Sequence, residues 1–115
     1  MNIFVCAKYY DDARNKESVQ KLIVSIFQRG DRPFCMMEDL SQWGKYNPSG
    51  EELIQRTFDA IDKCACVVVV SEDLGGTGMG IEIGYAYAKG IPILVTSSGD
   101  LPVMLWGVVL GVLAV

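Results

Sequence analysis

Apolar runs alternate with amphipathic segments along most of the chain. Strand-like runs rich in branched residues occupy residues 3–7, 33–37, 65–71, 91–96 and 108–115. Between them, residues 12–29 and 50–63 carry apolar side chains at helical spacing, with charged side chains on the other positions. This alternation of strands and helices predicts an α/β domain in which a parallel sheet is covered by helices on its faces.

Each predicted helix has one apolar stripe that is expected to face the sheet. In the first helix, which Gly30 is expected to end, the stripe consists of Val19, Leu22, Ile23, Ile26 and Phe27. In the second helix it consists of Leu53, Ile54, Phe58 and Ile61, with Thr57 at its edge.

The segment EDLSQWGKYNPSG, residues 38–50, lacks periodicity and is rich in turn-forming residues. It is therefore expected to be a surface loop, which could act as a lid over the edge of the sheet. Trp43 and Tyr46 are candidate ligand contacts within it, although loop aromatics more often pack against their own domain.

Length and charge limit the classes of protein that need to be considered. A chain of 115 residues that is 50% hydrophobic predicts a single domain over residues 1–115. Ten basic and 14 acidic residues give a net charge of −4, which argues against nucleic acid as a partner. The first residues, MNIFVCAKYYDD, indicate a strand rather than a signal peptide, so a cytoplasmic location is expected.

The last 15 residues, LPVMLWGVVLGVLAV, are almost wholly apolar. A membrane-spanning helix needs about 20 such residues, so a buried strand or a subunit contact is the better interpretation, and no membrane association is predicted. A surface this apolar favours a homodimer or a larger homo-oligomer.

Cysteine and histidine content restricts the possible chemistry. The four cysteines, Cys6, Cys35, Cys64 and Cys66, lack CxxC spacing and are interpreted as reduced, small apolar residues. Because the chain has no histidine, the usual zinc sites are poorly supplied with ligands and every histidine-dependent mechanism is excluded. Catalysis would have to use carboxylates, hydroxyls, lysine or thiol, and we predict neither a metal nor a cofactor.

Residues 75–90, GGTGMGIEIGYAYAKG, follow a strand and lead into a helix that Gly90 is expected to end. In open parallel sheets the ligand crevice lies beyond the carboxyl ends of the strands, where this turn is expected. Glycines at 75, 76, 78 and 80 allow the backbone to approach a ligand closely and to adopt positive φ values. The turn is therefore a candidate ligand site.

The glycine turn and Glu82, directly behind it, have three possible interpretations. The spacing of Gly78, Gly80 and Gly84 resembles a dinucleotide fingerprint, but that motif belongs after the first strand of its fold, not the third. Glu82 could instead be a first-turn carboxylate that complements the helix dipole. In the third role, a carboxylate kept ionised by the helix N-terminus attacks a sugar C1 atom and forms a covalent glycosyl-enzyme.

The stretch TGMGIEIGYAYAKGIPILV resembles the core motif of the nucleoside 2-deoxyribosyltransferase superfamily, in which a G-x-G-Φ-E-Φ-G-Y-A sequence holds the nucleophilic glutamate. Glu82 matches that glutamate. The resemblance extends to NIFVCA, IDKCACVVVV and VMLWGV and so covers most of the chain. It implies a flavodoxin-like, Rossmann-like, doubly wound sheet of five parallel strands with helices on both faces. It also implies oligomers that transfer or hydrolyse the N-glycosidic bond of deoxynucleosides or their monophosphates.

The chain departs from the family at several supporting positions. Phe4 stands where relatives have a tyrosine that hydrogen-bonds the nucleophile, and Tyr9 or Tyr10 could replace it. Thr57 stands where an aspartate often serves the leaving base, and Pro102 where some relatives place an asparagine in a neighbour's site.

Relatives often place an aspartate or serine at the position of Gly76, and Asp73 lies close to it in the sequence. Met104 matches a family methionine. The serines and arginines that bind phosphate in the monophosphate hydrolases have no counterpart in CAKYYDDAR.

These observations predict an enzyme of nucleotide metabolism, a transferase or hydrolase that acts on a small-molecule nucleoside or nucleotide, with Glu82 as its nucleophile. The candidate substrate-binding residues are Tyr9, Thr57, Asp73, Gly76, Gly78, Gly80 and Met104. Two alternatives remain open: a non-catalytic nucleotide-binding module and a TIR-like NAD hydrolase.

Overall fold

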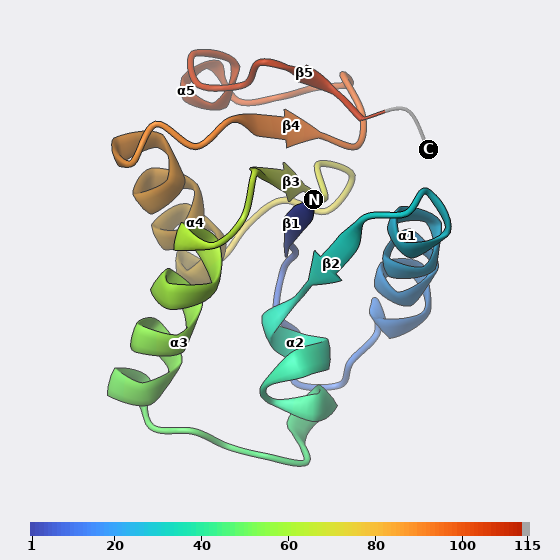
Figure 1. The fold of residues 1–115 in the computed structure, drawn as a ribbon, viewed down its shortest axis with the longest axis vertical. Helices are drawn as coiled ribbons and strands as arrows, with labels where there is room; N and C mark the ends of the chain where they lie inside the picture. Colours follow the sequence, from blue (N-terminus) through green and yellow to red (C-terminus); the bar gives the residue numbers. More distant parts are fainter. Residues whose placement is uncertain (114–115) are drawn as a thin grey trace.

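The structure is a computed structural model that describes residues 1–113. Five parallel strands form one sheet in the order β2-β1-β3-β4-β5 (Figure 1). Their bounds are β1 Asn2–Cys6, β2 Arg32–Phe34, β3 Cys66–Val69, β4 Ile93–Val95 and β5 Gly111–Val112. The predicted class, a flavodoxin-like doubly wound sheet, is confirmed, because this strand order is that of the flavodoxin-like folds.

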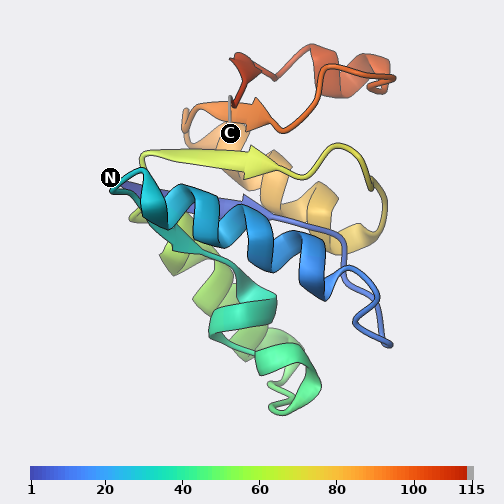
Figure 2. The same ribbon diagram turned by 90° about the vertical axis from the view of Figure 1, so that its right-hand side faces the viewer.

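Helices cover both faces of the sheet, as Figures 1 and 2 show. Helix α1, Lys16–Gln28, packs on one face, and α3, Gly50–Asp62, and α4, Thr77–Ala88, pack on the other. The short helices are α2 Met36–Asp39, η1 Gln42–Gly44 and α5 Val103–Trp106. None of the helices within residues 1–113 is long and apolar enough to cross a membrane.

Alternation along the strands divides the core into two layers. On β1, Ile3 and Val5 face the α1 side, whereas Phe4 and Cys6 face the side of α3 and α4. All four side chains are buried, which explains why a central parallel strand is an uninterrupted apolar run.

The order of the strands reverses direction between β1 and β3. The connection from β1 leads to β2 on one side, and the connection from β3 leads to β4 on the other. Such a switch point leaves a crevice outside the carboxyl ends of the two strands. The strand ends at Cys6 and Val69, which are register partners, therefore border the natural ligand position of this fold.

Aromatic stacking joins α3 and α4, the two helices that cover the same face of the sheet. The rings of Phe58 on α3 and Tyr85 on α4 are stacked with centroids 3.8 Å apart, and the Tyr85 hydroxyl donates a hydrogen bond of 2.7 Å to Asp62. This contact fixes the spacing of α3 and α4 along one flank of the molecule.

Several predicted bounds differ from the structure. The segment 38–50 is not entirely loop, because α2 and η1 occupy part of it. Phe27, predicted to lie on the buried stripe of α1, is 70% exposed, while its neighbour Ile26 is fully buried. The last predicted strand is much shorter than residues 108–115, and residues 114–115 lie outside the described part of the chain.

Candidate active site

A cavity of about 490 Å³ opens at the carboxyl ends of β1 and β2. Its walls come from the end of β1, the α2–η1 segment with the loop that follows it, the first two turns of α3, and the beginning of α4. The cavity therefore borders the crevice between β1 and β3, at the β3–α4 turn, and extends from there toward β2. It is large enough for a small organic ligand.

Two glycines make the turn that leads from β3 into α4. Gly75 and Gly76 line the cavity with φ values of +138° and +89°, a region that residues with a Cβ rarely adopt. Gly78 and Gly80, predicted to need positive φ as well, are instead ordinary residues of α4 with open space around them. Only two of the four glycines are thus required by backbone conformation.

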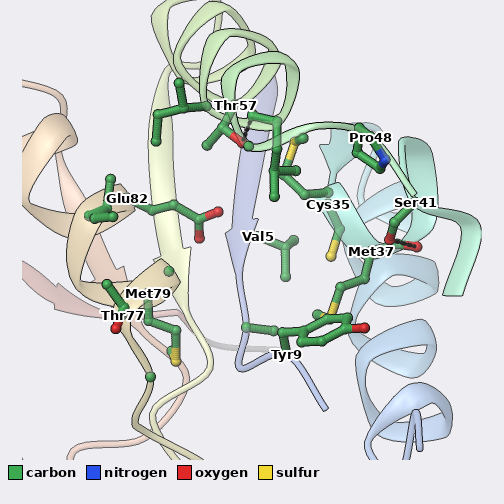
Figure 3. Close-up of a pocket in the computed structure, with 18 of the residues that line it drawn as sticks. Val5, Tyr9, Cys35, Met37, Ser41, Pro48, Thr57, Thr77, Met79 and Glu82 are labelled. Carbon is green, nitrogen blue, oxygen red and sulfur yellow. Dashed lines mark hydrogen bonds between the residues drawn. The ribbon is translucent and has the colours of Figure 1, made fainter. Parts of the chain in front are cut away.

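Glu82 lies in the second turn of α4, because the helix begins at Thr77. The favourable effect of the helix dipole on a carboxylate fades within the first turn, so that effect does not account for this glutamate. The side chain points from α4 into the cavity, toward Val5 on β1 (Figure 3). Its position is therefore explained by the cavity that it lines and not by the helix dipole.

Burial sets the charge state of Glu82. Desolvation raises the pKa of its carboxyl group from 4.5 to about 7, and a hydrogen bond from the Cys6 thiol lowers it in part. The sequence-based expectation that the helix N-terminus keeps Glu82 fully ionised is therefore wrong. Glu82 therefore titrates near neutral pH rather than near pH 4.5.

Two further candidates from the sequence lie in the same cavity. Thr57 on α3 is buried, and its hydroxyl donates a hydrogen bond of 2.7 Å to the Leu53 carbonyl oxygen one turn earlier. The ring of Tyr9, just beyond β1, lies on the opposite side of the cavity from Thr57, and Glu82 points into the space between them (Figure 3). Gly76 and Gly78 line the cavity as well, whereas Gly80 is not among its lining residues.

Asp73 and Met104 lie away from this cavity. The Asp73 carboxylate accepts a hydrogen bond of 2.8 Å from the Tyr10 hydroxyl and lines a separate hollow beside α1. Met104 is on α5 and is 88% exposed. Phe4 is a core residue whose ring stacks on Phe34, so it has no access to a ligand.

The two loop aromatics behave differently. Tyr46 lines the cavity, and its hydroxyl donates a hydrogen bond of 2.8 Å to Glu52 on α3. Trp43 packs against the α1-side core and donates through its indole nitrogen to Glu38. Only Tyr46 is placed to contact a ligand.

Sequence reasoning missed part of the apolar wall. Leu53 and Ile54, predicted to be buried against the sheet, are 39% and 37% exposed because they face the cavity. Met37 and Cys35 complete the wall from the end of β2 and the start of α2. The available signal was the apolar stripe on α3, of which Leu53 and Ile54 face the cavity instead of the sheet.

Cation-binding chemistry has little support in this part of the molecule. Within residues 1–113, no group of three or more Cys, Asp or Glu side chains is arranged to hold a metal ion.

The parallel sheet, its strand order and the crevice at the switch point define a flavodoxin-like α/β protein with a ligand cavity. No family model matches the sequence, and no curated protein sequence matches it. Solved structures do share its fold. The 2-deoxyribosyltransferase of Bacillus psychrosaccharolyticus has a TM-score of 0.73 and 15% identity, over 95% of this chain and 82% of that one.

Two other solved structures are similar. The CMP N-glycosidase of Clostridium botulinum has a TM-score of 0.69 and 19% identity, over 96% of this chain and 85% of the other. A conserved protein from Enterococcus faecalis has a TM-score of 0.65 and 19% identity, over 93% of this chain and 70% of the other. At these identities the likeness establishes a shared fold, and the resemblance found in the sequence is confirmed at that level.

The raised pKa of Glu82 predicts a pH-dependent effect of Glu82→Gln on stability. The folded state holds this proton up to about pH 7 and the unfolded state only to about 4.5, so ionisation destabilises the fold progressively between these values. Relative to wild type, Glu82→Gln should therefore gain stability between pH 4.5 and pH 8, by at most about 3 kcal/mol. Urea unfolding at several pH values measures this difference.

The exposed Glu51→Gln on α3 serves as a control for removing one negative charge from an acidic protein. Its stability difference from wild type should change little over the same pH range. If Glu82→Gln and Glu51→Gln show the same pH profile, Glu82 does not titrate with a raised pKa.

Proposed function

We propose that this protein cleaves or transfers the N-glycosidic bond of a nucleoside or nucleotide, with Glu82 as a covalent nucleophile. The observation that carries the proposal is the position of Glu82, the one carboxylate among the described residues that line the cavity, behind the two glycines of the β3–α4 turn. The shared fold supports it, since two of the solved structures described above are a 2-deoxyribosyltransferase and a CMP N-glycosidase.

In the proposed reaction, an ionised Glu82 oxygen bonds to C1′ of the sugar while the C1′–N bond breaks. The base leaves with the electron pair of that bond and takes a proton from water. Thr57 does not supply this proton in the proposal, because its hydroxyl is engaged by the Leu53 carbonyl oxygen. Water or a second base then attacks C1′, loses its own proton, and releases Glu82 as a carboxylate.

Replacing the nucleophile should abolish chemistry. Glu82→Gln keeps nearly the same shape but removes the charged oxygen, so base release should fall by several orders of magnitude, as is usual when a covalent nucleophile is lost. For wild type, release should increase as pH rises through about 7, because the ionised carboxylate is the reactive form. Chromatography of free base, with a panel of deoxynucleosides, ribonucleosides, their monophosphates and NAD, measures both effects.

The same panel distinguishes the alternatives. Intact-protein mass spectrometry of wild type should detect a glycosyl adduct that Glu82→Gln lacks, while Glu51→Gln should keep full activity. Substantial turnover by Glu82→Gln would refute the nucleophile. Release from NAD alone would support the TIR-like alternative, and ligand binding without any release would support a non-catalytic module.

Charge around the cavity favours an uncharged nucleoside over its monophosphate. Among the described residues that line the cavity, none is lysine or arginine, and Glu82 is a carboxylate. Lys8 lies near Gly75 at the rim, but its ammonium group stacks over the Tyr10 ring, 4.8 Å from the ring centroid. A phosphate would therefore bring negative charge toward Glu82 with no cation in the cavity wall to offset it.

We therefore expect a deoxynucleoside to be processed with a higher kcat/KM than its 5′-monophosphate, by about tenfold or more for one uncompensated charge pair. Added salt should narrow the difference, since it screens the repulsion. Measuring base release from both compounds at two salt concentrations tests this. A preference for the monophosphate that disappears in Lys8→Ala would show instead that Lys8 binds phosphate.

The C-terminal part of the chain supports the proposal of a homodimer or larger homo-oligomer. Five apolar side chains of α5, β5 and the segment between them are half or more exposed: Val103, Met104, Trp106, Leu110 and Val112. Monomeric proteins rarely leave so many neighbouring apolar groups in water, and self-association would cover them.

Met104→Glu should dissociate such an oligomer, because it places a charge within the apolar contact. Light scattering at micromolar protein gives the mass, which should exceed 12.6 kDa for wild type and approach it for the variant. Phe27→Glu, at an exposed apolar site on α1, is the matched control and should leave the mass unchanged. A wild-type mass of 12.6 kDa would rule out the oligomer.

A further inference from the structure

The loop between β1 and α1 carries two neighbouring tyrosines with different surroundings. Tyr9 lines the cavity and is 59% exposed, and its ring lies across from Thr57, with Glu82 pointing into the space between them (Figure 3). Tyr10 lies outside the cavity wall. A ligand bound in front of Glu82 therefore has the Tyr9 ring as a neighbour, and the position of that ring depends on how the loop is held.

Tyr10 ties this loop to the connection between β3 and α4. Its hydroxyl donates a hydrogen bond of 2.8 Å to the carboxylate of Asp73, in a partly buried position. The two residues are 63 positions apart in the sequence, so the bond joins two separate loops. A carboxylate is a stronger acceptor than a neutral oxygen. The loop that carries Tyr9 is thereby fastened to the loop that carries Gly75 and Gly76.

Two cations hold the Tyr10 ring in place. The ammonium group of Lys8 lies 4.8 Å from the ring centroid, and the guanidinium carbon of Arg14 lies 4.5 Å from it. Arg14 is oriented in turn by Asp12, to which its Nε and Nη2 atoms donate over 3.0 Å each. The Lys8 ammonium also lies against the turn into α4, because a Cβ atom at Gly75 would be 3.4 Å from it. The ring cannot turn away without losing these neighbours.

The backbone of the loop needs such contacts. Ala13 has a φ value of +54°, a left-handed conformation that is unfavourable for a residue with a Cβ atom. Its N–H donates 3.1 Å to the Tyr10 carbonyl oxygen, and the Asn15 side chain closes the loop by donating 2.8 Å to the Lys8 carbonyl oxygen. Strained backbone persists where surrounding contacts over-determine it. The side-chain contacts of Tyr10 are therefore part of what holds the loop.

We propose that Tyr10 and Asp73 are positioning residues, whose hydrogen bond clamps the β1–α1 loop to the β3–α4 connection and so holds the Tyr9 ring across the cavity from Glu82. Neither Tyr10 nor Asp73 lines the cavity, and both act through Tyr9. The proposal rests on the function proposed above and deepens it, because the clamp gives the nucleoside a preformed ring to bind against. Binding to a preformed site avoids the entropy that ordering the loop would cost.

Loss of the clamp should weaken binding and leave the chemical step nearly intact, because Glu82 is carried by α4 and Tyr9 by the loop. In Tyr10→Phe the KM for 2′-deoxyadenosine should rise about two- to tenfold, the range for one lost hydrogen bond. The kcat should change by less than about twofold. Partial unfolding would instead lower the apparent kcat, since fewer molecules are active, and would leave KM unchanged.

Changes on both sides of the hydrogen bond identify it as the cause. Asp73→Ala removes the acceptor and should raise KM as Tyr10→Phe does, and the double variant should be no worse than either single one. Asp73→Asn keeps an acceptor oxygen and should restore most of the wild-type KM. Tyr87→Phe, which removes the hydroxyl of an exposed tyrosine on α4, is the matched control and should leave KM unchanged. Additive effects of Tyr10→Phe and Asp73→Ala would overturn the clamp.

The position of Tyr9 can be followed without a catalytic assay. In protein labelled with 3-fluorotyrosine, the ¹⁹F resonance that disappears in Tyr9→Phe belongs to Tyr9. In Tyr10→Phe this resonance should narrow and move toward the shift of free fluorotyrosine, because the released ring is more mobile and more solvated. In Tyr87→Phe it should stay in place. A Tyr9 resonance that is unchanged in folded Tyr10→Phe protein overturns the proposal by itself.

The same measurements separate the clamp from the proposed reaction. If no nucleoside releases base while the Tyr9 resonance still moves in Tyr10→Phe, the reaction is wrong and the clamp stands. The dissociation constant of 2′-deoxyadenosine, titrated into Glu82→Gln with and without Tyr10→Phe, then replaces KM and should rise by the same factor. If base is released and neither the resonance nor KM responds to Tyr10→Phe, the clamp is wrong and the reaction stands.

Discussion

Placing a carboxylate against the end of a central strand is the constraint on which the architecture of the cavity depends. Removing Glu82 from water disfavours its charged form and so lowers the stability of the folded state. The side chain is held there because α4 packs close to β1 and β3. Gly75 and Gly76 adopt positive φ in the turn that leads from β3 into this helix. Turn, helix and strand therefore cooperate to present one side chain.

The alternation of apolar runs with amphipathic segments was sufficient to predict the fold class, because a parallel sheet with helices on both faces requires that pattern. Short elements were not predictable. Helix α2 has four residues and η1 three, too few for a period to emerge. Phe27 shows a second limit: neighbouring helical residues point about 100° apart, so Ile26 is buried while Phe27, at the edge of the same stripe, is exposed.

The predicted site residues that share a cavity are mostly those whose placement the local sequence determines. Glu82, Gly76 and Gly78 belong to one continuous motif, and the structure brings them to the same cavity with Thr57 and Tyr9. Asp73 is close to this motif in sequence, yet Tyr10 draws it to the other side of the loop, a preference that no local pattern encodes.

Cys6 illustrates the opposite difficulty. Cysteine is read as a small apolar residue from composition, and its burial agrees with that interpretation. Its contact with α4, through the carbonyl oxygen of Met79, depends on which turn of the helix faces the end of β1, and that register is set by packing across the whole sheet. Residues distant in sequence that meet through tertiary packing remain beyond the reach of pattern analysis.

The stacked pair of Phe58 and Tyr85 has a consequence for the evolution of ligand choice. The pair ties α3 to α4, and these helices supply Leu53, Ile54 and Glu82 to the cavity. The width available to a ligand is therefore governed by two rings that do not line the cavity. Exchanging one ring for a smaller side chain allows the helices to approach each other, so selection can alter the size of the accepted ligand while every wall residue stays the same.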